Sequence, residues 1–158
     1  MSELADLGDE IRRITRGNPW HGPSLAEIVS DISAEEAEAK PFPGVHSIRE
    51  IVLHIAGWQE VFFLRLQGKM ASEPPEGDFP EGPAGWHASL AKLEESNRRL
   101  LSVISGLSDA SLEAGVAGKD YTVGFMLHGL VSHCVYHSGQ ISLVKRALRS
   151  GRVGADRP

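Results

Sequence analysis

Cysteine is nearly absent from this sequence of 158 residues, in which Cys134 is the only one. A single thiol excludes an internal disulfide and fits a reducing compartment. A basic excess is absent as well, because the formal net charge is −5 at pH 7. Proteins that bind nucleic acid usually carry a basic surface, so the composition argues against nucleic acid as a partner.

Long apolar runs are also missing. The most apolar stretch, residues 51–66, is interrupted by His54, Glu60 and Arg65, so it is not expected to span a membrane. Residues 1–13 alternate charged residues with leucine and lack the apolar core of a signal peptide. We therefore expect a cytoplasmic protein with one domain over residues 1–150, followed by a flexible tail at residues 151–158.

Four segments have helical periodicity, and no stretch shows sustained strand-like alternation. The predicted helices cover residues 2–32, with a break near residues 17–23, and residues 47–68, 86–107 and 123–149. Ser24 with Glu27, and Ser47 with Glu50, have the spacing of capping boxes, which mark helix starts. The segment 71–85 is rich in proline and glycine and is predicted to form a loop. Four long amphipathic helices in one domain predict an all-α four-helix bundle, an architecture that often holds metals in its interior.

Two histidines interrupt the apolar face of the last predicted helix. The residues on this face are Met126, Leu130, His133, His137, Ile141, Val144 and Leu148. His133 and His137 are four residues apart, which places both rings on one face, where they can bind a single ion. His128 lies nine residues before His137, on the opposite side of the helix, and cannot join them.

A third ligand must come from another helix, and His54 in the apolar run is the candidate. Three histidines would leave coordination positions open, which is typical of catalytic metal sites. The alternative is that these are core histidines that hydrogen-bond a backbone or hydroxyl group and bind no metal.

Two motifs carry a resemblance to a known family. PGVHSIREIVLHIAGWQ (residues 43–59), followed by HGLVSHCVYHSGQI (residues 128–141), resembles the DinB-like family of metal-dependent enzymes, and the N-terminal WHGPSL is similar to it as well. The resemblance covers residues 7–148. It implies a four-helix bundle, often dimeric, that binds one divalent metal ion such as zinc or nickel through three histidines, which correspond here to His54, His133 and His137.

The further candidates for the surroundings of the metal are Trp20, His21, Trp58 and Gln140. The break in the first helix is expected to lie beside the metal, where it could turn Trp20 and His21 toward the pocket, with His21 as the candidate catalytic residue. The alternative is that Trp20 packs and His21 is solvated. Trp58, one turn after His54, is expected to line the pocket, although core packing explains it equally well.

Gln140 and Cys134 flank His137 along the last predicted helix. Gln140 is expected to hydrogen-bond a ligand histidine or a bound water. Cys134 is expected to be a buried apolar thiol, and not a ligand.

The resemblance also implies a function. Characterised relatives include transferases and isomerases that use low-molecular-weight thiols, so we expect an enzyme that acts on a small molecule with such a thiol as co-substrate. The metal would lower the pKa of a bound thiol or water. The alternatives are a metal-dependent hydrolase, with His21 or the metal-activated water as base, and a non-enzymatic, stress-related metal-binding protein. The helix at residues 47–68 has more apolar surface than one core needs, which predicts a homodimer.

Overall fold

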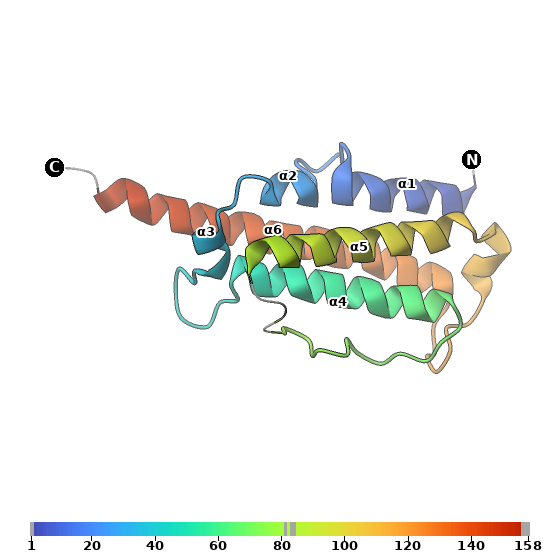
Figure 1. The fold of residues 1–158 in the computed structure, drawn as a ribbon. Coiled ribbons are helices and arrows are strands. Elements are labelled where there is room, and N and C mark those ends of the chain that lie inside the picture. Colours follow the sequence, from blue (N-terminus) through green and yellow to red (C-terminus); the bar gives the residue numbers. More distant parts are fainter. Residues whose placement is uncertain (1, 81, 83–84, 156–158) are drawn as a thin grey trace.

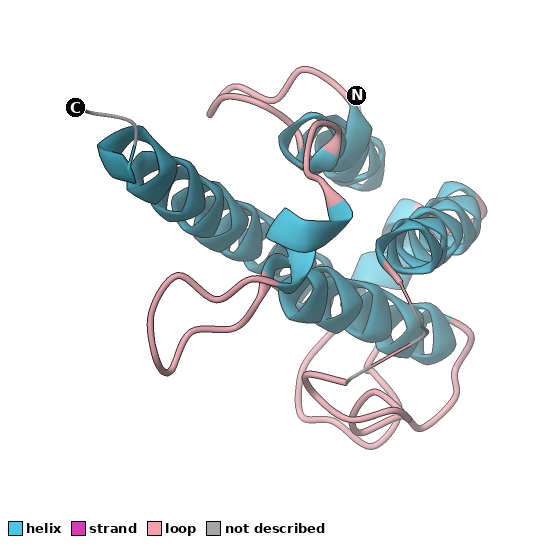
Figure 2. Cartoon of the chain, turned by 60° about the vertical axis from the view of Figure 1, so that its left-hand side comes forward, coloured by secondary structure: helices cyan, strands magenta, loops and turns pink. Residues whose placement is uncertain are grey.

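The structure is a computed structural model that describes residues 2–80, 82 and 85–155. The helices are α1 (Glu3–Arg16), α2 (Leu25–Val29), α3 (Ala34–Glu38), α4 (Ile48–Leu66), α5 (Trp86–Ser105), the 3-10 helix η1 (Asp109–Glu113) and α6 (Val123–Ala155). The described residues form no strand, and a single isolated bridge joins Gly115 to Thr122 (Figure 2). Within these residues, no helix combines the length and the hydropathy needed to cross a membrane.

The long helices form the predicted four-helix bundle. Helix α4 packs against α5 and α6, and α1 packs against the same two helices from the other side (Figure 1). The short α2 follows α1 nearly end to end, which confirms the predicted break. The core between the four helices is apolar and includes Ile11, Leu25, Ile55, Leu100 and Leu130, all fully or almost fully buried.

The predicted capping boxes are present at the starts of α2 and α4. At α4 the Glu50 backbone N–H donates to the Ser47 hydroxyl over 3.2 Å, and the Ser47 N–H donates to the Glu50 carboxylate over 2.8 Å. At α2 the Ser24 N–H donates to the Glu27 carboxylate over 2.7 Å. These contacts satisfy backbone donors that have no partner within the helix, so they set where each helix begins.

The prediction that the last helix ends near residue 149 is wrong. Helix α6 continues to Ala155, into the segment predicted to be a tail. Gly151 and Gly154 reduce helix propensity by only about 1 kcal/mol each relative to alanine, whereas a proline, the residue that would break the helix, first occurs at Pro158. Residues 156–158 lie outside the described part of the chain, and the flexibility of residues 151–158 stays a prediction.

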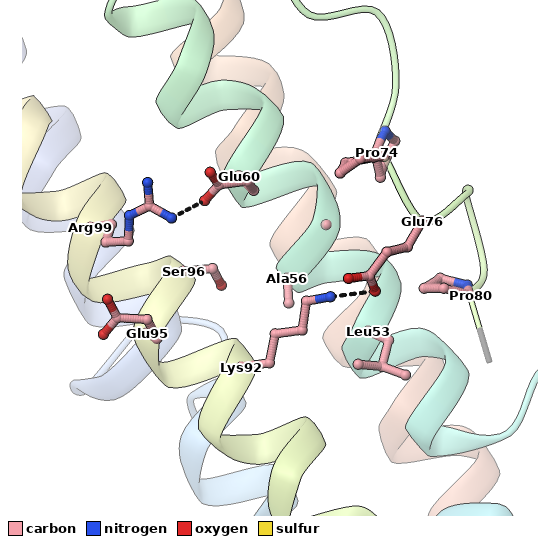
Figure 3. A pocket seen from close by; sticks show the side chains of 12 residues that line it. Leu53, Ala56, Glu60, Pro74, Glu76, Pro80, Lys92, Glu95, Ser96 and Arg99 are labelled. Atoms are coloured by element: carbon pink, nitrogen blue, oxygen red, sulfur yellow. Dashed lines mark hydrogen bonds and ion pairs between the residues drawn. The ribbon is translucent and has the colours of Figure 1, made fainter. Parts of the chain in front are cut away.

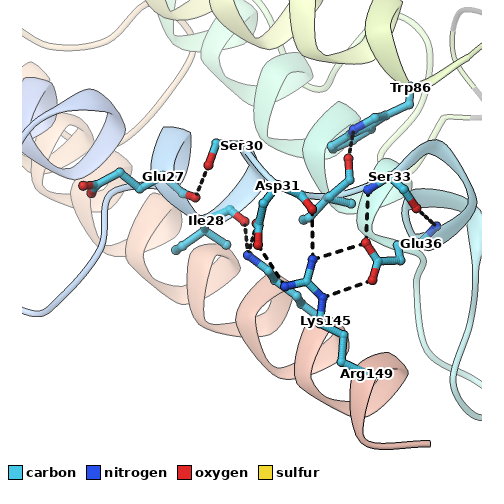
Figure 4. Close-up of polar contacts among 10 residues, drawn as sticks. Glu27, Ile28, Ser30, Asp31, Ser33, Glu36, Trp86, Lys145 and Arg149 are labelled. Carbon is cyan, nitrogen blue, oxygen red and sulfur yellow. Dashed lines mark hydrogen bonds and ion pairs between the residues drawn. The ribbon is translucent and has the colours of Figure 1, made fainter. Parts of the chain in front are cut away.

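Polar contacts tie the segment after the break to α6 (Figure 4). Lys145 donates to the Ile28 carbonyl oxygen over 2.8 Å and pairs with Asp31. Arg149 pairs with Asp31 over 2.9 Å and with Glu36 over 3.0 Å. The hydrogen bonds from Lys145 and Arg149 lower the pKa of Asp31 to about 2. Lys145 and Arg149 of α6 therefore hold α2 and α3 on the bundle, although the helix is broken between α1 and α2.

The loop that follows α4 runs back along that helix before α5 begins (Figure 1). The buried Arg65 holds its start by donating to the carbonyl oxygens of Ala71 and Ser72 over 2.8 and 3.0 Å. Pro74 lies against Gly57, where a Cβ atom would approach the proline ring to 3.0 Å. The loop thus covers part of the apolar surface of α4, the surface from which a homodimer was predicted.

Candidate metal centre

Three histidines from two helices meet between α4 and α6. His54 on α4 and His133 on α6 place their Nε2 atoms 2.9 Å apart, and the His137 ring lies 4.4 Å from the His54 ring and 4.5 Å from the His133 ring, centre to centre. The donor atoms of all three lie within 4.8 Å of one another. The structure therefore brings together the residues chosen from helical periodicity.

Helical geometry explains why these histidines converge and His128 does not. His133 and His137 are one turn apart on the face of α6 that packs against α4. His128 is exposed, and its Nε2 lies 3.7 Å from a carboxylate oxygen of Glu3 on α1. The prediction that His128 points away from the cluster is confirmed.

The hydrogen bonds of His54 and His137 leave their Nε2 atoms available. His54 Nδ1 lies 2.7 Å from the Asp78 carbonyl oxygen, and His137 Nδ1 lies 2.6 Å from Gln140 Oε1. Both partners only accept, so each Nδ1 carries the proton and each Nε2 keeps its lone pair. Gln140 also donates from Nε2 to the Tyr136 hydroxyl over 3.2 Å.

Burial keeps His133 and His137 neutral. Removal from water, reinforced by His137 and His54, lowers the pKa of His133 to about 3. Removal from water also lowers the pKa of His137. Neutral imidazole nitrogen is a preferred ligand of divalent transition metals.

The donor set fits a divalent ion. Two ligands of one ion, each bonded at about 2.0–2.1 Å, lie no more than about 4.2 Å apart, and the Nε2 atoms of His54 and His133 satisfy this limit. His133 Nδ1 is buried without a hydrogen-bond partner, so within the described residues the only polar contact of this ring is the one between its Nε2 and His54. His54, His133 and His137 could therefore hold a metal ion.

The cluster lies close to the surface. His54 and His137 are buried, but His133 is only half-buried. The half-buried Trp58 lies 6.4 Å from the rings of His54 and His133, so it lies beside the cluster, and its role in lining a pocket stays a prediction. Gln140 occupies its predicted place beside His137. Of the three rings, that of His133 is therefore the one most exposed to solvent.

Trp20 and His21 do not occupy the place predicted for them. Trp20 is 102% exposed and His21 is exposed, and the two line a surface depression together with Asp6 and Glu10 of α1. Within the described chain, no contact joins either residue to the three histidines. The backbone at the break turns away from the bundle, because two glycines and two prolines free it from the helical path without specifying a direction.

Three residues of the site were not found from the sequence. Asp78 and Phe79 come from the loop, and the Phe79 ring stacks between His54 at 4.2 Å and His46 at 3.6 Å. Tyr136 lies beside His137 on α6, with a ring separation of 5.0 Å. Loop residues follow no periodic pattern, so no signal pointed to Asp78 or Phe79. Tyr136 precedes Gln140 by one helical turn, and this spacing could have indicated it.

Cys134 is a buried thiol, as predicted. Its side chain lies in the core, and burial raises its pKa to about 12. It therefore stays protonated at neutral pH, and it does not belong to the group of His54, His133 and His137 that could hold an ion.

A separate cavity of about 210 Å³ lies between α4, α5 and the loop (Figure 3). Its walls include apolar side chains such as Leu53 and Pro74. Charged pairs border it, among them Arg99 with Glu60 at 2.8 Å. None of the three histidines lines it, so the cavity and the histidine cluster are different places in the fold.

Comparison with known families agrees with this geometry. The profile of the DinB superfamily matches residues 20–141, which include all three histidines. The match covers more than half of the chain, so the protein belongs to the DinB superfamily. A search of curated proteins returns no match.

The histidine cluster leads to a prediction about metal content. Purified protein should contain close to one divalent ion per chain, and His54→Ala, His133→Ala or His137→Ala should each remove most of it, because two remaining imidazoles bind an ion far less tightly than three. Elemental analysis after dialysis measures the occupancy. His128→Ala is the matched control and should keep the wild-type content. Full occupancy in any of the three ligand variants would contradict the assignment.

The lowered pKa values of His133 and His137 predict acid sensitivity of metal-free protein. An unfolded histidine has a pKa of about 6.5, so at pH values between this and about 3 the unfolded chain binds more protons than the folded one. The free energy of unfolding should therefore fall as the pH decreases below about 6.5. Urea unfolding with a chelator present, in wild type and in His133→Leu, measures this. The variant should lose less stability on acidification, and an equal loss would exclude His133 as a cause.

Proposed function

We propose that the protein is a divalent-metal-dependent enzyme that acts on a small molecule, with a low-molecular-weight thiol as co-substrate. The observation that carries the proposal is the set of three histidines, two of them buried and one half-buried, at the edge of the bundle. Membership of the DinB superfamily is compatible with it. We expect zinc or nickel as the ion.

The protein side chains would fix the ion and leave one side open. His54 and His137 would bind through Nε2, since their Nδ1 atoms donate to Asp78 and Gln140. Three neutral ligands leave the full positive charge of the ion in place. A bound divalent ion would supply the Lewis acid that lowers the pKa of a thiol or of water.

The surroundings favour a soft, compact ligand. The side chains next to the histidines include Trp58, Phe79, Tyr136, the amide of Gln140 and the carboxylate of Asp78. Aromatic rings and an anion suit a thiol better than a phosphate-rich substrate, which would need cationic groups. Sulfur is also a soft ligand that zinc binds well.

Titration of cobalt-substituted protein with small bacterial thiols tests the thiol. A sulfur-to-cobalt absorption band should appear and saturate, and protons should be released on binding. A simple anion such as azide is the control for an open coordination position. If azide binds and no thiol produces the band, a metal-dependent hydrolase replaces the transferase. If neither ligand perturbs the spectrum, the ion has no exchangeable position and a non-enzymatic, metal-stabilised protein is the better description.

We also propose that the protein forms a homodimer, on grounds that differ from those given by the sequence. Helix α6 exposes Phe125, Tyr136 and Leu143. At about 100° per residue, their directions agree within about 20°, so they form one apolar stripe on a single face. Exposed apolar stripes of this kind are typical of interfaces between subunits.

Light scattering should give a mass of twice 17.1 kDa at micromolar concentration. Leu143→Lys places a charge in the stripe and should shift the mass toward the monomer. Phe42→Lys, at an exposed aromatic residue outside α6, is the matched control and should remain dimeric. A monomeric wild type would refute the dimer. A dimeric Leu143→Lys variant would show that the interface lies on another face of the protein.

A further inference from the structure

Asp78 makes two contacts with a single atom of the cluster. His54 Nδ1 lies 2.7 Å from the carbonyl oxygen of Asp78 and 3.2 Å from its carboxylate oxygen Oδ1. The same Oδ1 accepts a hydrogen bond of 2.8 Å from Trp58 Nε1. Both oxygens on His54 are acceptors, so they retain the ring proton on Nδ1 and turn the lone pair of Nε2 toward His133.

The loop around Asp78 is fixed to α4 on both sides. Arg65 donates to the carbonyl oxygens of Ala71 and Ser72, and Pro74 packs on Gly57. Immediately after Asp78, the Phe79 ring lies 4.2 Å from the His54 ring and nearly parallel to it. Asp78 therefore meets His54 in a defined position although its own side chain is 57% exposed.

The three histidines differ in the charge of their partners. Asp78 places a carboxylate beside His54, whereas Gln140 gives His137 a neutral amide and His133 Nδ1 has no partner. A carboxylate behind a ligand histidine orients the ring and increases its basicity toward the ion. Among the three ligands, His54 alone receives this effect.

We infer that Asp78 is a positioning residue of the metal centre, which holds His54 in the Nδ1–H tautomer and increases the affinity of the three histidines for a divalent cation. This inference rests on the proposed function. Asp78 acts through His54 and Trp58, and it needs no contact with the substrate.

Two substitutions separate geometry from charge. Asn at position 78 retains an oxygen that can accept from Trp58 and His54 but removes the charge. Asp78→Ala removes the charge and the carboxylate contacts with Trp58 and His54, and leaves the backbone carbonyl oxygen as the acceptor for His54 Nδ1. Asp78→Ala should weaken zinc binding by about 10- to 100-fold, and Asp78→Asn by an intermediate factor. Competition with a chromophoric chelator measures both, and circular dichroism verifies the fold.

Glu76→Ala is the matched control, because Glu76 is an exposed carboxylate of the same loop that pairs with Lys92 and makes no contact with His54. Its zinc affinity should equal that of the wild type. An Asp78→Ala affinity equal to that of Glu76→Ala would overturn the inference.

The tautomer of His54 is a second readout, which works without metal. In metal-free wild type, long-range ¹H–¹⁵N spectra should show His54 protonated on Nδ1. Asp78→Asn should preserve this tautomer, and Asp78→Ala, which keeps only the carbonyl acceptor, should populate the Nε2–H form in part. Wild-type His54 protonated on Nε2 would overturn the inference. If wild-type protein binds no divalent ion, the proposed function fails, while these spectra still decide whether Asp78 positions His54.

Discussion

The packing of α4 against α6 is the constraint on which the site depends. His54 comes from one helix and His133 and His137 from the other, at positions where a bundle core normally has leucine. Burying imidazoles in place of apolar side chains costs stability unless each polar atom has a partner. Asp78 and Gln140 provide partners for two of the rings, but His133 Nδ1 has none. This arrangement is unfavourable for a structural core and suits a set of ligands.

The loop after α4 has two roles that cannot be separated. It covers apolar surface of that helix, with Pro74 against Gly57, and it brings Asp78 and Phe79 to His54. Arg65, a buried cation, would be costly without the carbonyl oxygens of the loop. The contacts that hold the loop for stability therefore also determine the geometry around His54.

Most of the fold could be predicted because its determinants are local. The Ser47–Glu50 capping box and the spacing of His133 and His137 act within a few residues along one helix, where a regular backbone converts spacing into direction. The end of α6 was misplaced because residues 151–158 were predicted to be a frayed tail, whereas helix α6 continues through Gly151 and Gly154 to Ala155.

The sequence by itself determined which faces of the helices are apolar, where the helices begin, and that His54, His133 and His137 belong to inward faces. The tertiary structure alone decided what completes the site. Asp78 and Phe79 reach His54 from a loop, and Trp20 turns away from the bundle at a break. Outside regular helices no period relates sequence position to direction, so the course of a segment depends on the surface against which it packs.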